Sequence, residues 1–307
     1  MTIVHIINPY SGSEQHLKHQ ELTFESIRRA KSYARGSVEV QVYAMYDRED
    51  EGLIPEFVDH KFRLERSALD CDPSLKGKRL PLLKDLIDPV VAHCNADYVV
   101  YSNIDIGLQL NFYKVVQELI QQGYDAFAIN RRRVSGHYSE VSDLDQIYAE
   151  AGKMHNGYDC FVFRRELANQ FDLGQVCLGI PFVDSVLFFN LVAFADHFKL
   201  FTGKHLTFHL GYELVKKWGS EAWVAFNKKE YLKVLKGLKD QLQLKNLPGS
   251  GLPFLKRHFK WLMNPTIHYP TVCRLDLSSK QSQRYIQSKK IKGNYYERLQ
   301  KLIKLDY

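Results

Sequence analysis

The sequence has few cysteines and no long apolar run. Its five cysteines are odd in number and include no Cys-x-x-Cys pair, so we expect neither a disulfide framework nor a zinc site. No apolar run reaches the roughly 18 residues of a membrane-spanning helix. The longest stretch, Ser185 to Ala195, is interrupted by Asn190, and Met1 to Tyr10 lacks the features of a signal peptide. We therefore expect free thiols and a reducing compartment, which favours a cytoplasmic location.

Several nucleotide-binding and hydrolytic motifs are also absent. No GxGxxG follows the first apolar run, and neither GxxxxGK[ST] nor GxSxG occurs. Dinucleotide oxidoreductases, P-loop kinases, P-loop-type sulfotransferases and α/β-hydrolases are therefore disfavoured.

With 307 residues, 45% of them hydrophobic and 25% charged, the chain has the composition of a globular protein with one large domain or one domain and an extension.

Charge is distributed unevenly along the chain. Residues 225–307 contain 18 Lys and Arg and five Asp and Glu, whereas residues 1–224 contain 24 and 30. A basic extension on an acidic body favours an anionic partner, such as phospholipid headgroups, an anionic glycan or nucleic acid. The alternative is a solvated lysine-rich helical face. No recognised DNA- or RNA-binding motif is present, so nucleic acid is the least favoured partner.

Short apolar runs alternate with amphipathic segments over the first two thirds of the chain. We predict strands at 2–7, 38–45, 62–65, 97–102, 124–130, 158–163 and 205–210. We predict helices at 21–33, 80–94 with a break or kink at Pro89, 112–122, 182–195, 221–238 and 294–305, and an irregular mobile loop at 131–156. This alternation predicts an α/β fold with a central, mostly parallel sheet flanked by helices. Ligands bind such sheets beyond the carboxyl ends of the strands.

The most informative segment is the apolar run 97–102, which is followed by Asn103, Ile104 and Asp105. Side chains at positions i and i+2 of an extended segment point the same way, so Asn103 and Asp105 can present two oxygen ligands to one Mg²⁺ or Mn²⁺. Such a cation neutralises a diphosphate leaving group. The alternative is that Asp105 caps the following turn.

The order of elements over residues 1–212, with this DxD-like segment at its centre, resembles that of the GT-A glycosyltransferases. Their DxD motif binds the metal and the diphosphate of a nucleotide-sugar. The resemblance implies a Rossmann-like GT-A fold and transfer of a sugar from a nucleotide-sugar to an acceptor hydroxyl, in glycan or polysaccharide synthesis. The sequence departs from the motif at Asn103, and the missing charge leaves metal dependence open.

The resemblance also implies roles for residues that follow later strands. His209 matches a histidine that contacts the metal or the diphosphate after the last sheet element. Asp184 matches the acid at the start of a helix that serves inverting enzymes as catalytic base; its alternative role is to cap that helix. Gly157 and Asp159 match the glycine-containing acceptor loop, and Asp159 is the second candidate acid. An ordinary turn is the alternative for this loop.

Nucleotide binding is expected after the first strand and near the 80–94 helix. Asn8, Pro9 and Tyr10 follow the strand where GT-A folds hold the base, and the Tyr10 ring can stack on it. Arg79 and Lys84 can reach phosphates. The alternative for each basic residue is a solvated surface charge.

These expectations divide the chain into a GT-A-like nucleotide-sugar-binding catalytic domain at 1–224 and a basic, largely helical extension at 225–307 packed on it. The expected partners are a nucleotide-sugar donor, a glycan or other hydroxyl acceptor, a divalent cation (Mn²⁺ or Mg²⁺) and, at the periphery, the inner face of an anionic membrane. Two rival functions remain: a catalytically inactive protein that binds a nucleotide-sugar or another anionic ligand, and a nucleotidyltransferase. The latter is ranked lower because residues 8–13 contain a single glycine.

Overall fold

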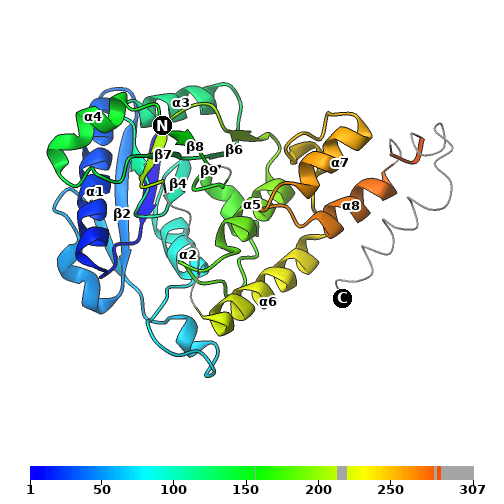
Figure 1. The fold of residues 1–307 in the computed structure, drawn as a ribbon, viewed down its shortest axis with the longest axis horizontal. Coiled ribbons are helices and arrows are strands. Elements are labelled where there is room, and N and C mark those ends of the chain that lie inside the picture. Colours follow the sequence, from blue (N-terminus) through cyan, green and yellow to red (C-terminus); the bar gives the residue numbers. More distant parts are fainter. Residues whose placement is uncertain (156, 213–219, 280–281, 285–307) are drawn as a thin grey trace.

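The computed structural model describes residues 1–155, 157–212, 220–279 and 282–284 (Figure 1). The strands of the described part are β1 (Thr2–Ile7), β2 (Glu39–Tyr46), β3 (His60–Arg63), β4 (Tyr98–Ser102), β5 (Gly107–Leu108), β6 (Ala126–Ile129), β7 (Arg132–Val134), β8 (Lys153–Met154), β9 (Cys160–Arg164), β10 (Phe198–Phe201) and β11 (Thr207–Leu210). The α-helices are α1 (Glu14–Ala34), α2 (Leu83–His93), α3 (Phe112–Gln121), α4 (Leu144–Ala149), α5 (Val183–Phe194), α6 (Glu221–Leu238), α7 (Phe254–Leu262) and α8 (Tyr269–Ser278).

A seven-stranded sheet in the order β10-β6-β9-β4-β1-β2-β3 forms the centre of the molecule. All neighbouring pairs are parallel except those of β9, which runs antiparallel to β4 and β6. Alternate residues of each strand enter different cores. Ile3 and Ile7 pack with α1 and α3, whereas Val4 and Ile6 pack with α2 and α5. Burial on both faces explains the nearly continuous apolar strands. The predicted α/β fold with a mostly parallel sheet is confirmed.

The prediction that residues 131–156 form an irregular loop is wrong. This segment contains β7, α4 and β8, and β7 and β8 join β5 and β11 in a second, four-stranded sheet of order β5-β11-β7-β8. The segment is polar because these strands are only two or three residues long and most of their residues are partly or fully exposed. β7 is held by pairing with β11, and β8 by pairing with β7, and no local pattern indicates either pairing.

Other element boundaries also differ from the predictions, most of all the start of α1. α1 begins at Glu14, where Ser13 accepts a capping hydrogen bond from the His16 backbone, rather than at residue 21. α2 continues through Pro89 without ending there. The short strand β10 was not predicted, and the helix predicted at 294–305 lies outside the described residues.

The described part of the C-terminal region packs against α5. Tyr231 and Leu235 of α6 and Trp261 of α7 belong to the same apolar core as α5. The side chains of Gln243 and Asn246 donate hydrogen bonds to carbonyl groups at the end of α5, which otherwise lack partners. α6 begins at Glu221, so the division proposed at 224/225 falls inside this helix. No helix among the described residues combines the length and the apolar character that crossing a bilayer requires.

Candidate active site

Four elements bring polar side chains to one edge of the central sheet. Asp105 follows β4, and Arg131 follows β6. Asp159 immediately precedes β9, and because β9 is antiparallel to its neighbours, the start of β9 lies at the edge where β4 and β6 end. Asp184 lies in the first turn of α5. We refer to Asp105, Asp159 and Asp184, together with Arg131 and His209, as the acidic cluster.

Asp105 and His209 meet because β5 pairs antiparallel with β11, with Gly107 opposite Phe208. His209 Nε2 lies 3.2 Å from Asp105 Oδ2. Only glycine fits at position 107, since a Cβ atom there would lie 2.2 Å from the Phe208 ring. The close contact between the Gly107 backbone and the Phe208 ring therefore fixes the spacing of Asp105 and His209.

Arg131 and Asp159 form a short ion pair at the bottom of the site. The Asp159 side chain is 3% exposed and that of Arg131 16%. Arg131 also fixes the adjoining loop, because its carbonyl accepts a hydrogen bond from the His155 backbone amide. The loop is tight: a Cβ atom on Gly157 would lie 2.6 Å from His155 Nε2.

Asp184 does not cap α5. The N-cap residue is Phe182, whose φ of 86° lies in the left-handed region, and no side chain supplies a capping hydrogen bond. This conformation is strained for a bulky residue, and the Phe182 ring is stacked on Tyr231 of α6 with 5.2 Å between centroids. Asp184 is partly buried, and no hydrogen bond links its side chain to another described residue. Of the two roles open to Asp184 from sequence, the capping role is excluded.

The carboxylates perturb one another's protonation. Burial, reinforced by the charges of Asp159 and Asp105, raises the pKa of Asp184 well above its ordinary value, and Arg131 offsets this only in part. Burial also raises the pKa of Asp159 against the opposing effect of Arg131. Burial acts in the same direction on Asp105, but the hydrogen bond with His209 and the nearby charges outweigh it and lower the pKa of Asp105.

Four atoms of the acidic cluster are buried without a hydrogen-bond partner among the described residues. They are Asp105 Oδ1, Asp159 Oδ2, Arg131 Nε and His209 Nδ1. Buried polar groups in folded proteins are almost always paired, so their concentration at one edge of the sheet indicates a site that a polar ligand completes.

The residues predicted to hold the nucleotide differ in how exposed they are and in whether their side chains already have partners. Burial, and then the Asp105 charge, raise the pKa of Tyr10 to about 12. Its backbone is fixed by Gln20, which accepts from the Tyr10 amide and donates to its carbonyl. The residue remains 36% exposed, and Pro9 before it is buried. The Asn8 side chain instead donates to the Met45 carbonyl at 2.6 Å and serves the loop.

Two predicted phosphate ligands have partners outside the acidic cluster. Arg79 pairs with Asp47 at 2.9 Å, and Lys84 pairs with Asp88 at 2.5 Å one turn along α2. Neither ion pair is buried, so a ligand can displace it.

Tyr101 and His155 border the site and were not predicted. Tyr101 donates to Asn103 Oδ1 at 3.2 Å, and burial with the nearby charges of Asp184 and Asp105 raises its pKa. Burial and the charge of Arg131 lower the pKa of His155 to about 4. Alternation along β4 gave a signal for Tyr101, which is two residues from Asn103 and therefore on the same side.

The site fits a divalent cation only in part. No group of three or more His, Cys, Asp or Glu side chains that could hold a metal occurs among the described residues. Asp105 and His209 are nevertheless 3.2 Å apart, and two adjacent ligands at ~2.1 Å from an octahedral ion are ~3.0 Å apart. Mg²⁺ and Mn²⁺ complete their coordination with substrate phosphates and water. Two protein ligands therefore suit an ion that arrives with a diphosphate.

No protein-family model matches this chain, and no curated protein sequence matches it. Among solved structures, the chain is similar to S. aureus TarS 1–349 in complex with UDP-GlcNAc, with a TM-score of 0.51, 14% identity, and coverage of 85% of this chain and 73% of that chain. It also matches glucosyl-3-phosphoglycerate synthase from Mycobacterium tuberculosis in complex with Mn²⁺, UDP and phosphoglyceric acid, with a TM-score of 0.43, 11% identity, and coverage of 77% and 78%. The likeness to TarS establishes the fold, and the predicted resemblance to the GT-A fold is confirmed.

Proposed function

We propose that this protein transfers a sugar from a nucleotide-sugar donor to an acceptor hydroxyl, in the synthesis of a glycan or polysaccharide. The observation that carries the proposal is the acidic cluster: three carboxylates, an arginine and a histidine converge at the carboxyl edge of a GT-A-type sheet with four buried atoms unpartnered. Sugar transfer requires two chemical functions in the same site. One stabilises the departing diphosphate, and the other accepts the proton of the attacking hydroxyl.

We assign the diphosphate end to Asp105 and His209. A divalent cation held there would neutralise the charge that develops on the leaving diphosphate. Asn103 completes the DxD-like segment without a charge, and its amide oxygen already accepts a hydrogen bond from Tyr101. Tyr10, which is exposed and is affected electrostatically by Asp105, is the proposed stacking surface for the base.

Asp184 is the proposed general base, and Asp159 is the second candidate. A base must be free to accept a proton and accessible to the acceptor. Asp184 has no hydrogen-bond partner among the described residues, whereas Asp159 is nearly fully buried and paired with Arg131. The raised pKa of Asp184 makes its carboxylate a stronger proton acceptor than an ordinary aspartate.

The donor and the location are proposed on less specific grounds. TarS is bound to UDP-GlcNAc in its structure, which makes a UDP-sugar the first donor to test. Four of the five free cysteines are buried, which is consistent with the reducing environment of the cytoplasm.

The test is a thermal-shift panel of UDP-, GDP-, CMP- and dTDP-sugars with and without Mn²⁺, followed by a transfer assay with the stabilising donor. Ligand binding stabilises the folded state by mass action, so even a weak donor raises Tm at high concentration. We expect one nucleotide class to raise Tm, and Mn²⁺ to enlarge the shift. The Kd of such a donor is expected to be millimolar or lower. If no nucleotide-sugar raises Tm at a concentration ~100-fold above its expected Kd, the proposal fails.

A second candidate function is nucleotide-sugar binding without turnover. It is favoured by Asn103, which removes one charge from the DxD-like segment, and by the pairing of the Asn103 amide with Tyr101. The same panel separates the two functions, because a binding protein gives the thermal shift with neither transfer nor slow hydrolysis of the donor.

A further inference from the structure

The outer face of α7 carries the largest apolar exposure in the described part of the chain. Leu255, Phe259, Leu262 and Met263 are 54%, 67%, 59% and 66% exposed. Leu252, just before the helix, is 38% exposed. Elsewhere in the described residues exposed large apolar side chains are isolated in the sequence, and isolated ones need no explanation. A cluster of five within twelve residues does.

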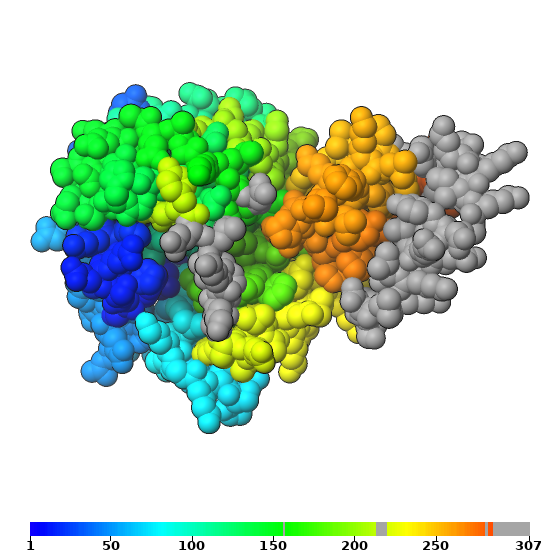
Figure 2. Space-filling view, viewed as in Figure 1, coloured from blue at the N-terminus to red at the C-terminus, as the bar shows by residue number. Residues whose placement is uncertain are grey.

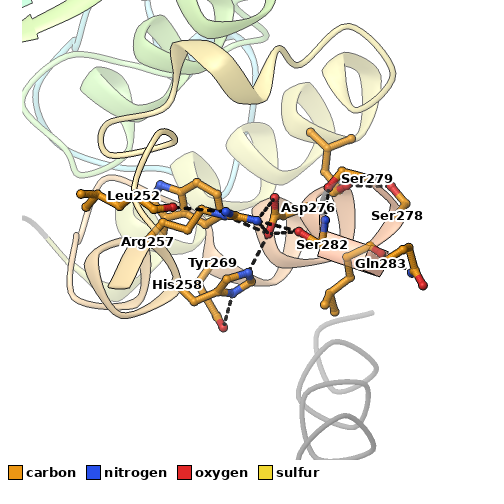
Figure 3. Close-up of polar contacts among 12 residues, drawn as sticks. Leu252, Arg257, His258, Tyr269, Asp276, Ser278, Ser279, Ser282 and Gln283 are labelled. Atoms are coloured by element: carbon orange, nitrogen blue, oxygen red, sulfur yellow. Dashed lines mark hydrogen bonds and ion pairs between the residues drawn. The ribbon is translucent and has the colours of Figure 1, made fainter. Parts of the chain in front are cut away.

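The helix cannot turn this face inward, because a buried network fixes the opposite face. Arg257 donates to both carboxylate oxygens of Asp276 in α8, and His258 Nε2 lies 2.8 Å from Asp276 Oδ2 (Figure 3). Ser282 contacts both Arg257 and Asp276. The side chains of Arg257, His258 and Asp276 are 3%, 4% and 5% exposed. We refer to these four residues as the C-terminal clamp.

Trp261 fixes the helix from the same side as the clamp. It is fully buried, and its indole nitrogen donates to the Pro248 carbonyl at 3.0 Å. Figure 2 shows the α7–α8 region at the end of the described part of the molecule away from α1. The helix is therefore fixed on one side and leaves its apolar side chains exposed on the other.

Lysines border the exposed apolar side chains. Lys256 and Lys260 are one turn apart on α7, and both are exposed. The region beyond residue 224 has 18 Lys and Arg against five Asp and Glu. An apolar ridge flanked by lysines is the pattern of a helix that lies in a membrane interface, where the ridge enters the acyl boundary and the lysines reach anionic headgroups. A protein partner would instead require a surface that is both apolar and acidic.

We propose that α7 docks the protein on an anionic lipid surface, with Leu255, Phe259, Leu262 and Met263 entering the interface and Lys256 and Lys260 contacting the headgroups. The inference is independent of the proposed glycosyl transfer. It explains the excess of basic residues in the C-terminal region by a specific contact between lysines of α7 and lipid headgroups.

The test is co-sedimentation of the full chain with vesicles of phosphatidylcholine containing roughly 30% phosphatidylglycerol, against pure phosphatidylcholine. We expect binding to the anionic vesicles, weaker at ~0.5 M than at ~0.05 M salt. Phe259→Ser/Leu262→Ser should reduce it at least about tenfold, since each side chain loses its apolar contact. The matched control Tyr33→Ser/Leu110→Ser removes exposed apolar side chains elsewhere and should bind as the wild type does.

A second pair of variants tests the charges. Lys256→Gln/Lys260→Gln should weaken binding and reduce its salt dependence, whereas Lys61→Gln/Lys76→Gln, also exposed, should not. Vesicle binding that is absent in the wild type, or unchanged in Phe259→Ser/Leu262→Ser, overturns the proposal.

Two other occupants of the face give different results, and each overturns the proposal. If a second copy covers it, the wild type elutes as a dimer in size exclusion and the apolar variant as a monomer. If another part of the same chain covers it, the apolar variant loses several degrees of Tm, whereas substitutions on a free surface leave Tm nearly unchanged.

Discussion

The acidic cluster and the C-terminal clamp are built from the same side-chain types and differ in how completely they are paired. In the clamp, Asp276 has bonds to both of its oxygens from Arg257, His258 and Ser282. In the acidic cluster, Asp105 and Asp159 each keep one buried oxygen without a partner among the described residues. A satisfied buried network stabilises and orients, whereas an unsatisfied one costs stability that a ligand restores.

The electrostatic consequence differs between the carboxyls of the two clusters. In the acidic cluster the pKa values of Asp159 and Asp184 are raised, whereas that of Asp105, which is bonded to His209, is lowered. Burial alone raises the pKa of any carboxyl group. At Asp276 the hydrogen bonds from His258, Arg257 and Ser282 outweigh burial and lower the pKa, whereas at Asp184 burial and the neighbouring carboxylates raise it. Perturbed carboxyls with raised pKa values are characteristic of catalytic sites, and well-paired ones are characteristic of structural sites. The contrast separates a structural role from a functional one, and each of the following experiments tests it.

The largest expected effect is on the clamp. Arg257→Ala leaves the Asp276 carboxylate buried with fewer partners, which should lower the free energy of unfolding by about 3–5 kcal/mol. Urea unfolding at pH 7 measures it. The neighbouring Lys256→Ala, on the exposed face of the same helix, should change stability by no more than about 0.5 kcal/mol. A loss below about 1 kcal/mol for Arg257→Ala would mean that the clamp is not a stabilising unit.

The next effect is on Asp184, where function and stability should separate. Asp184→Asn keeps the shape and removes the basicity, so transfer should fall about 10²-fold or more with donor binding unchanged. Because Asp184 does not cap α5 and its buried carboxyl is costly to ionise, Asp184→Ala should leave the protein at least as stable as the wild type at pH 7. Steady-state transfer and urea unfolding measure the two quantities, and the exposed Glu118→Gln is the control. Near-wild-type transfer by Asp184→Asn would move the base assignment to Asp159.

A smaller effect is expected on the diphosphate end. Asp105→Asn should weaken donor binding about tenfold in the presence of Mn²⁺ and little in its absence, because it removes the charged member of the Asp105–His209 pair. Asn103→Asp is the matched gain of charge and should lower the Mn²⁺ concentration needed for donor binding. Calorimetric titration of the donor at several Mn²⁺ concentrations measures both variants. Equal loss by Asp105→Asn with and without Mn²⁺ would contradict a metal role.

Residue order along the chain was enough to single out Asp105 and Asp184, whose roles in the candidate site stay predictions. Asp105 follows an apolar run and Asp184 opens an apolar segment. Both features can be recognised in the sequence without the tertiary structure. The central sheet followed from the alternation of strands and helices. The capping role considered for Asp184 was wrong, because the cap depends on the left-handed backbone of Phe182, which no side-chain preference indicates.

The features that sequence did not predict depend on contacts between distant segments. The Arg131–Asp159 pair exists because β9 enters the sheet antiparallel, which an apolar run cannot specify. The short strands around Arg132 are fixed by β11, far along the chain. The clamp joins Arg257 to Asp276 across a turn in a region where the hydrophobic pattern is weak. Local propensity is a weak guide wherever tertiary pairing supplies the stabilisation.

The smallest expected effect, and the most direct comparison of the two clusters, is the pH dependence of stability. A carboxyl whose pKa is raised by folding stabilises the protein below its unfolded value of 3.8, and that contribution is lost as pH rises through the folded pKa. Asp184 is of this kind. A carboxyl whose pKa is lowered contributes above 3.8 and loses the contribution as pH falls, which is the behaviour expected of Asp276.

Asp184→Asn should therefore gain stability relative to the wild type as pH rises from about 5 to about 8, since the wild type alone must ionise a buried carboxyl over this range. Each unit of difference between folded and unfolded pKa is worth about 1.4 kcal/mol. Asp276→Asn should instead lose a constant amount, because Asp276 is ionised in both the folded and the unfolded states throughout this range. Urea unfolding at four or five pH values measures both differences. A flat difference for Asp184→Asn would show that its carboxyl titrates normally in the folded protein, and would remove the electrostatic distinction between the acidic cluster and the clamp.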